Sequence, residues 1–146
     1  MTLVVGWAGF DDKARHRRKV SSLYIAADSR INWNGVTRYD GHQKVFASIR
    51  HPEIFGFCGD VTFCNMIISQ ILAKIDSDIL FDSDEPNKQV VISEEMAQML
   101  IKYPITGEIE RSEIIYGTRG ANQFHFYLIK FKDRHVLVSE WPITKE

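Results

Sequence analysis

Cysteine is scarce in this sequence. Only Cys58 and Cys64 are present, without a Cys-x-x-Cys pair or a closely spaced histidine. Two cysteines are too few for a disulfide framework, and the missing partners exclude the common structural zinc motifs. We expect both to be reduced thiols in the core, because cysteine is among the residues most often buried.

An excess of charge of one sign is missing as well. Eighteen Lys and Arg stand against nineteen Asp and Glu, a net charge of -1. This balance gives no support to nucleic-acid binding through overall charge. The basic run 15–19 lies in a polar segment, 9–22, between two expected strands, where charges are ordinarily only solvated. Nucleic-acid binding through this run is therefore the weakest of our functional hypotheses.

Long hydrophobic runs are absent too. No stretch approaches the about 18 apolar residues of a transmembrane helix, and the apolar start 1–7 lacks the basic region of a secretory signal. We therefore expect a cytoplasmic protein that does not associate with membranes. The chain has 146 residues, 45% of them apolar and 25% charged, which fits one globular domain and excludes a disordered or fibrous chain.

The order of elements predicts the fold class. Alternating apolar residues predict seven strands, over 3–8, 23–28, 44–49, 54–58, 113–118, 123–131 and 135–140. A 3.6-residue period predicts a helix from Asp60 to Asp76, and a second helix is expected from an N-cap at Ser93 to a stop at Pro104. Four strands, two helices and three strands indicate an α+β fold with the helices on one face of an antiparallel sheet.

Common catalytic motifs are missing. The sequence has no Walker loop, no Gly-x-Ser-x-Gly elbow and no His-Glu-x-x-His. Its five histidines are scattered, and no two stand at the helical spacing of metal ligands, so we expect no metal site. The histidines are His16, His42, His51, His125 and His135.

Thr2 is the most pointed chemical feature. It follows Met1 and begins a predicted strand, so that removal of Met1 places a hydroxyl and a free α-amine on one residue. An α-amine is less basic than a lysine amine and can accept the hydroxyl proton near neutral pH. Many chains begin with Met-Thr, so the weight of this feature depends on the residues that accompany it.

Three further elements carry a resemblance to a known family. Asp28-Ser29-Arg30 closes the second predicted strand, Lys44 precedes Val45-Phe46, and Gly59 stands at the turn from strand to helix. Lys44 follows Asp28 by sixteen residues and Gly59 follows Lys44 by fifteen. With this pattern, the chain resembles the β-subunits of proteasomes and their simpler bacterial relatives, which are N-terminal nucleophile (Ntn) hydrolases. The resemblance covers almost the whole chain.

The resemblance implies a catalytic site. Thr2 is expected to supply the nucleophile through its hydroxyl and the base through its amine. Lys44 is expected beside Thr2, where its charge favours deprotonation, and Asp28 is expected to pair with Lys44. Gly59 is expected to donate its backbone N–H to the oxyanion. The competing interpretations are an ordinary ion pair for Asp28 and Lys44 and a plain turn glycine for Gly59.

A pocket for the substrate side chain before the scissile bond is also implied, with a preference for apolar side chains. By family position it is lined by Ile31, Phe46, Phe57 and Val61, with His42 and Asn65 at its margin. These residues could equally be part of an ordinary core. Met66, Met96 and Met99 are expected in core packing, with subunit contacts as the alternative.

The resemblance implies an Ntn-type αββα sandwich of antiparallel sheets over residues 1–146, lacking its C-terminal helix layer. The serine and aspartate motif that supports the threonine in the family has no counterpart here, since Ser139 is followed by Glu140 and Trp141. No cofactor is required. Peptides or unfolded proteins are the implied substrates, and a homo-oligomeric ring with an ATP-dependent unfoldase is the implied assembly. The alternative to a threonine peptidase is a non-catalytic structural subunit on the same fold.

Overall fold

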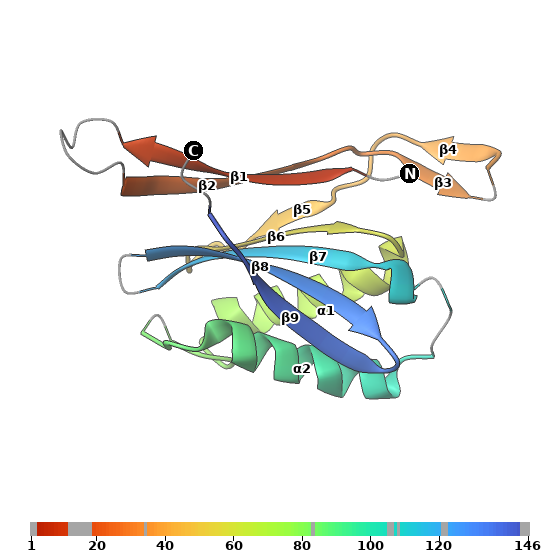
Figure 1. The fold of residues 1–146 in the computed structure, drawn as a ribbon. Helices are drawn as coiled ribbons and strands as arrows, with labels where there is room; N and C mark the ends of the chain where they lie inside the picture. Colours follow the sequence, from red (N-terminus) through yellow and green to blue (C-terminus); the bar gives the residue numbers. More distant parts are fainter. Residues whose placement is uncertain are drawn as a thin grey trace.

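The computed structural model describes residues 3–11, 19–33, 35–82, 84–104, 107, 109–120 and 123–143. They form an α+β fold of antiparallel strands and two α-helices (Figure 1). The helices are α1 (Val61–Asp76) and α2 (Lys88–Lys102), and a short 3-10 helix, η1 (Ile109–Arg111), follows them. The strands are β1 (Val4–Asp11), β2 (Lys19–Ala27), β3 (Ile31–Trp33), β4 (Thr37–Tyr39), β5 (Val45–Ala47), β6 (Glu53–Cys58), β7 (Glu113–Gly120), β8 (Gln123–Lys132) and β9 (His135–Trp141).

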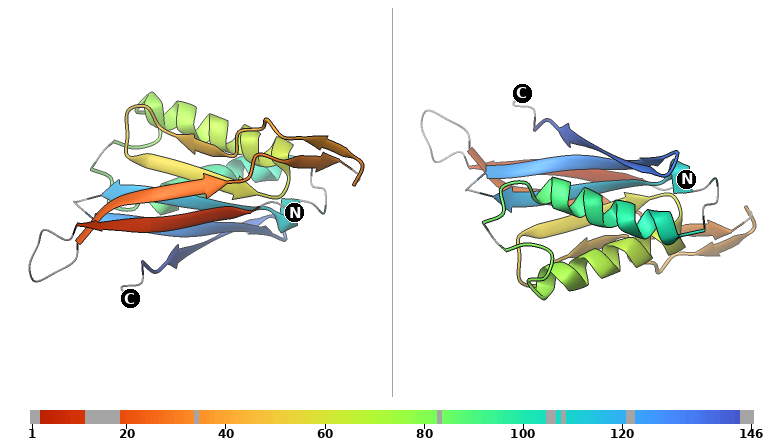
Figure 2. Two further views of the ribbon diagram at one scale, coloured as in Figure 1. Left: turned by 90° about the horizontal axis from the view of Figure 1, so that it is seen from above. Right: turned by 90° about the horizontal axis from the view of Figure 1, so that it is seen from below.

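The described strands form one large sheet and two small ones. The large sheet has five strands in the order β5-β6-β7-β8-β9, and β1-β2 and β3-β4 are two-stranded. Both helices cover one face of the large sheet, and β1-β2 lies on the opposite face (Figure 1). In the view from below, α1 and α2 lie side by side in front of the strands of the large sheet (Figure 2). The predicted α+β class and the placement of the helices on one face are confirmed.

Helix α1 forms where the apolar period predicts it. Asp60 caps it, with its side chain accepting a hydrogen bond from the Phe63 amide, and the helix ends at Asp76. The helix buries one continuous apolar stripe against the large sheet. That stripe consists of Phe63, Cys64, Ile67, Ile68, Ile71, Leu72 and Ile75. Its burial is the largest contribution of α1 to the core.

Helix α2 begins earlier than the sequence predicts. It starts at Lys88, and Ser93 lies inside the helix with its hydroxyl bonded to the Val90 carbonyl, so the predicted N-cap at Ser93 is wrong. The physical reason is the Lys88 side chain, which is buried and paired with Glu53 of β6. This tertiary ion pair fixes a first helical turn that local capping signals do not mark.

The two sheets pack closely because glycines face the β1-β2 pair. A Cβ atom on Gly56 of β6 would lie 2.6 Å from Ile25 of β2 and 3.0 Å from Val4 of β1. A Cβ atom on Gly117 of β7 would lie 3.3 Å from Leu23 of β2. Side chains of β1 and β2 therefore fill the space that these two glycines leave open. The result is a stack of β1-β2, the large sheet and the helix pair.

The other face of β1-β2 is exposed and apolar. Val5, Trp7 and Tyr24 are 44–46% exposed, and Leu3 is 65% exposed. Trp7 and Tyr24 are paired in the strand register and their rings stack with centroids 5.3 Å apart. Within the described residues no element covers this row, which we call the outer apolar face.

Two strands were not predicted. Strands β3 and β4 contain three residues each, and they pair Ile31 with Tyr39 and Trp33 with Thr37. Strand β2 also begins at Lys19 rather than Leu23, and β1 extends to Asp11. Within the predicted excursion 9–22, residues 9–11 and 19–22 are therefore strand, and residues 12–18 lie outside the described ranges.

A buried ion pair ties helix α2 to the large sheet. Lys88 Nζ lies 2.6 Å from Glu53 Oε1, with the two side chains only 3% and 0% exposed. The Tyr116 hydroxyl donates to the other carboxylate oxygen of Glu53 at 2.5 Å. Lys88 Nζ also lies 5.4 Å from the centre of the Phe81 ring. The pair is fully enclosed, so removing one partner leaves a buried charge.

We expect Lys88→Met to lower the free energy of unfolding by about 3–5 kcal/mol, because it leaves the Glu53 carboxylate buried without its cation. The double variant Glu53→Gln with Lys88→Met should recover part of that loss. Lys74→Met is the matched control, since Lys74 pairs with Glu95 at a partly exposed position, where about 1 kcal/mol or less is expected. Urea denaturation measures all three, and equal losses in Lys88→Met and Lys74→Met would contradict the assignment.

Candidate functional site

Asp28 and Lys44 form an ion pair at one end of the two-sheet stack. Lys44 lies directly before β5, and its Nζ is 2.6 Å from Asp28 Oδ1, just after β2. The Lys44 side chain is only 1% exposed, and its Nζ also donates to the Arg30 carbonyl oxygen at 2.5 Å. The Phe57 amide of β6 donates to the Lys44 carbonyl. Lys44 is therefore held by its backbone and by its charged end.

The other oxygen of Asp28 reaches the start of β1. The Leu3 amide donates to Asp28 Oδ2 at 3.0 Å, and the Asp28 amide donates to the Leu3 carbonyl at 3.0 Å. Leu3 directly follows Thr2, and Thr2 itself lies outside the described residues. One carboxylate thus joins the residue after the predicted nucleophile to the predicted lysine. We call Asp28, Lys44 and the Arg30 carbonyl the lysine network.

The charge state of Asp28 follows from these contacts. Burial acts to raise the pKa of Asp28, but the hydrogen bonds from Lys44 and from the Leu3 amide outweigh it. The pKa of Asp28 is consequently below its ordinary value. The carboxylate is ionised at neutral pH and can balance the Lys44 ammonium group.

Gly59 lies at the turn between β6 and α1. Its φ of +106° belongs to the left-handed region that favours glycine, and a Cβ atom there would lie 2.5 Å from the Cα of Ser112. The Asp60 amide donates to the Ser112 hydroxyl at 2.9 Å. This close approach explains the glycine, and it is compatible with the oxyanion role that the resemblance implies.

Four of the predicted pocket residues line one hollow of about 560 Å³. They are Ile31, His42, Val61 and Asn65. The hollow is also lined by four residues that the sequence reasoning missed, which are Tyr39, Thr62, Met66 and Ser69. Tyr39 was missed because β4 is too short to show a period, and the others because only the apolar stripe of α1 was interpreted. We call this hollow the side-chain pocket.

Phe46 and Phe57, also predicted in the lining, are not among the residues that line the side-chain pocket. Phe57 is fully buried, and its ring meets that of His42 edge on, with centroids 6.3 Å apart. The Phe46 ring stacks on the Phe57 ring, with centroids 6.3 Å apart, and is partly buried against the core cluster. Phe57 therefore contacts the pocket through His42, and Phe46 packs against Phe57.

The lining of the side-chain pocket is uncharged apart from the titratable ring of His42. Ser69 donates its hydroxyl to the Asn65 side-chain oxygen at 3.3 Å, which leaves the Asn65 amide nitrogen as the donor of that side chain. The Nε2 atom of His42 is buried and has no hydrogen-bond partner among the described residues. The pocket therefore suits a neutral side chain.

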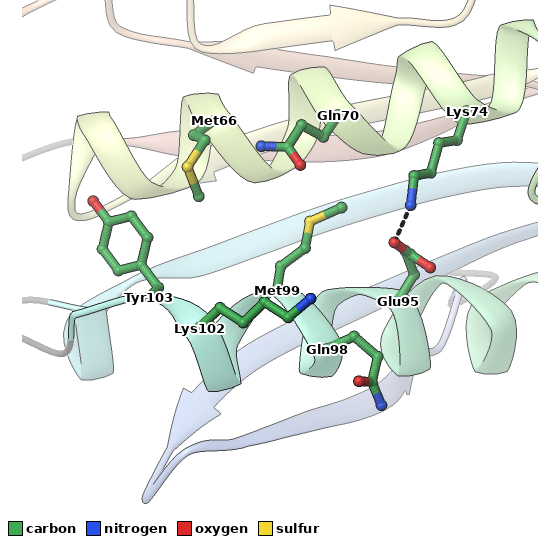
Figure 3. Close-up of a pocket in the computed structure, with 8 residues that line it drawn as sticks. All are labelled: Met66, Gln70, Lys74, Glu95, Gln98, Met99, Lys102 and Tyr103. Carbon is green, nitrogen blue, oxygen red and sulfur yellow. Dashed lines mark hydrogen bonds and ion pairs between the residues drawn. The ribbon is translucent and has the colours of Figure 1, made fainter.

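A second hollow lies between α1 and α2 on the outer side of the helix layer (Figure 3). Met66, Gln70 and Lys74 come from α1, and the Lys74 and Glu95 side chains form an ion pair across one end. Met99 also lines this hollow, whereas Met96 is fully buried in the core. Met66 and Met99 are partly buried against the core cluster, so the expected core packing is confirmed, and both also line this hollow, which keeps subunit contacts open as the alternative.

Other nucleophile and cofactor sites have little support. Burial raises the pKa of the Cys64 thiol to about 12, and burial together with the Glu113 carboxylate raises the pKa of Cys58. Both thiols are free, as predicted, although Cys58 is only half-buried. In the part of the chain that the structure describes, no three His, Cys, Asp or Glu side chains form a cluster that could hold a metal ion.

Comparisons with known proteins do not identify a family. Neither the models of known protein families nor the curated proteins give a match to this chain. Among the described residues, no helix has both the length and the apolar character to cross a membrane.

The depressed pKa of Asp28 gives a prediction for acid stability. In the unfolded chain its pKa returns to about 3.9, so below about pH 4 the unfolded state binds more protons. The stabilisation from Asp28 is complete above that pH and is lost as the pH falls through the folded-state pKa. We expect Asp28→Asn to be less stable at pH 7 and to lose less stability between pH 7 and pH 3 than the wild type. Urea unfolding at both pH values measures this, with Asp84→Asn as the exposed control, and parallel pH profiles for Asp28→Asn and the wild type would refute it.

The left-handed turn gives a second prediction. Gly59→Ala combines a disfavoured φ with a contact against the Ser112 backbone, and we expect it to lower the free energy of unfolding by about 2–4 kcal/mol. Gly120→Ala is the matched control, because a Cβ atom at Gly120 meets nothing within 4 Å. Thermal and urea unfolding compare the two, and a Gly59→Ala protein as stable as the Gly120→Ala protein would rule out the strain.

Proposed function

We propose that this chain is a threonine-type peptidase subunit that cleaves peptide bonds with Thr2 after removal of Met1. The observation that carries the proposal is the lysine network. The Asp28 carboxylate connects the Lys44 ammonium group to the amide of Leu3, the residue next to Thr2. A buried lysine held by two oxygen acceptors near Leu3 supports the proposal, because its positive charge would favour deprotonation of the Thr2 amine and hydroxyl.

The chemistry follows from the groups at this end of the molecule. The Thr2 hydroxyl adds to the substrate carbonyl carbon, and the Thr2 α-amine accepts the hydroxyl proton. The Lys44 charge favours that transfer, while the Gly59 N–H donates to the oxyanion. The amine proton then passes to the leaving nitrogen as the amide bond breaks, and an ester on Thr2 forms. Water hydrolyses this ester and restores the hydroxyl.

The side-chain pocket supports a peptide substrate. Ile31 stands next to Arg30, whose carbonyl accepts from Lys44, and Val61 opens the helix that follows Gly59. Two residues that line the pocket are therefore close in sequence to proposed catalytic groups: Ile31 to the acceptor of Lys44, and Val61 to the oxyanion donor Gly59. Its mainly apolar lining favours a neutral, apolar side chain before the scissile bond.

The stack of β1-β2, the large sheet and the helix pair supports an Ntn-type αββα sandwich in which one helix layer is absent from these residues. We extend the proposal to a homo-oligomeric ring in the cytoplasm that receives unfolded chains from an ATP-dependent unfoldase. Met66 and Met99, which are partly buried and line the hollow between the two helices, are candidates for subunit contacts.

A structural subunit on the same fold is the second candidate function. The outer apolar face favours it, because Val5, Trp7 and Tyr24 remain 44–46% exposed and suit cover by another polypeptide. In that case the lysine network serves only to join the two sheets. Nucleic-acid binding through residues 15–19 stays a weaker hypothesis, and most of that run lies outside the described residues.

Intact mass and peptide cleavage together test the proposed function. We expect the active protein to lack Met1 and to cleave a fluorogenic peptide with an apolar residue before the bond. Thr2→Ala and Lys44→Ala should each reduce kcat/KM by at least about 100-fold, because they remove the nucleophile and the charge that activates it. Thr2→Ser should keep measurable activity, since serine also carries a hydroxyl and an α-amine.

Lys74→Ala is the control for loss of a lysine charge away from the lysine network. Undiminished cleavage by Thr2→Ala, or unchanged turnover by a protein that retains Met1, would exclude the threonine mechanism. A processed and folded protein that cleaves no peptide would favour the structural subunit.

A further inference from the structure

The β3-β4 hairpin is closed at its base by a two-point ion pair. Arg30 directly precedes β3 and Asp40 directly follows β4, one step beyond the Ile31–Tyr39 pair of the hairpin register. Arg30 Nε lies 2.6 Å from Asp40 Oδ1, and Arg30 Nη2 lies 3.1 Å from Asp40 Oδ2. The Ser29 hydroxyl also donates to the Asp40 carbonyl at 2.8 Å. We call the Arg30–Asp40 pair the hairpin clamp.

Two parts of the candidate site meet at this clamp. The Arg30 carbonyl oxygen accepts the hydrogen bond from Lys44 Nζ at 2.5 Å. The next pair along the hairpin, Ile31 and Tyr39, lines the side-chain pocket. The His42 amide donates to the Ser29 carbonyl at 3.3 Å, which links a third pocket residue to the same segment. The segments 29–31 and 39–42 therefore carry one acceptor of Lys44 and one wall of the pocket.

The hairpin clamp is expected to contribute little to the free energy of folding. The Arg30 and Asp40 side chains are 49% and 59% exposed, and an ion pair at that exposure contributes little to global stability. Its bidentate geometry nevertheless fixes the relative orientation of the two chain segments. The hydrogen bond from Arg30 lowers the pKa of Asp40, so the contact persists into mild acid. The clamp can therefore orient the site without being a major part of the folding free energy.

We propose that Arg30 and Asp40 are positioning residues of the candidate hydrolase, which hold the pocket wall and the Arg30 carbonyl together so that filling of the pocket is coupled to alignment of Lys44. This inference rests on the proposed threonine peptidase function. It names the substrates most affected: peptides whose side chain before the scissile bond is long enough to press on Ile31 and Tyr39. Peptides with alanine at that position do not reach the wall and depend less on the clamp.

Three variants and one control test the clamp. Asp40→Asn and Arg30→Gln each remove one charge, and Arg30→Asp combined with Asp40→Arg exchanges the charges while keeping the Arg30 carbonyl in the backbone. Asp78→Asn is the control for loss of another Arg–Asp contact, because Asp78 accepts from Arg50 at 2.8 Å, and its other oxygen lies 2.7 Å from His51 Nε2. Asp78 has a φ of 55°, which asparagine tolerates. Urea unfolding should give similar stabilities for Asp40→Asn and Asp78→Asn.

The first readout is independent of activity. Lys44 is almost fully enclosed, so we expect slow modification by an amine-reactive reagent in the wild type. Its modification, measured by mass spectrometry relative to exposed Lys132, should rise severalfold in Asp40→Asn and Arg30→Gln. It should return towards the wild-type rate in the charge exchange and stay unchanged in Asp78→Asn.

The second readout measures KM and kcat separately for two peptide substrates. For a peptide with leucine before the bond, we expect Asp40→Asn to raise KM and lower kcat, with kcat/KM falling about tenfold or more. For the alanine peptide, KM should change little and the fall should be smaller. The charge exchange should restore part of the leucine preference. A purely structural role for the pair would change both peptides equally.

The outcomes distinguish this inference from the proposed function. A wild type that has lost Met1 but cleaves neither peptide would overturn the proposed function, and the positioning role would fall with it. An active wild type in which Asp40→Asn alters neither Lys44 modification nor the leucine preference would overturn the clamp alone. Increased Lys44 modification together with selective loss on the leucine peptide, both reversed by charge exchange, would support it.

Discussion

The Asp28 carboxylate is the contact on which the arrangement of this end of the molecule depends. One of its oxygens accepts from the Leu3 amide at the start of β1, and the other pairs with Lys44 at the start of β5. Strand β1 belongs to the small sheet and β5 to the large one, so a single carboxylate bridges two layers. Its two oxygens offer enough lone pairs for both contacts. As a result, the Lys44 side chain is enclosed while the Asp28 carboxylate balances its charge.

The close approach of the two sheets serves the same end. Gly56 and Gly117 leave room for Leu23, Ile25 and Val4, so that β1-β2 lies directly on the large sheet. A larger residue at either glycine would lift β1-β2 away and lengthen the path from Asp28 to Lys44. The close packing at Gly56 and Gly117 thus helps to keep Asp28 within ion-pair distance of Lys44. The opposite end of the large sheet is held to α2 by a separate buried pair, Glu53 and Lys88.

Prediction from sequence succeeded where one local pattern was long and consistent. Helix α1 repeats its apolar residues for four turns and has an aspartate cap, and the structure reproduces both ends of the predicted helix to within one residue. Helix α2 begins five residues before the predicted cap, because Lys88 is stabilised by Glu53, thirty-five residues away along the chain. Strands β3 and β4 are too short for any period, so Tyr39 and the hairpin clamp were not anticipated.

The sequence by itself determined the α+β class and helix α1, since these depend on local periodicity, and the family resemblance singled out Asp28 and Lys44 as candidate site residues. Only the tertiary structure decided that Asp28 and Lys44 meet, that Leu3 shares their carboxylate, and that Ile31, His42, Val61 and Asn65 line one hollow. It also decided that Phe57 is buried in the core and that Phe46 packs against the core, and neither is among the residues that line that hollow. The reason is physical: distances between residues sixteen or more apart in sequence are set by how sheets and helices pack, and no local pattern records them.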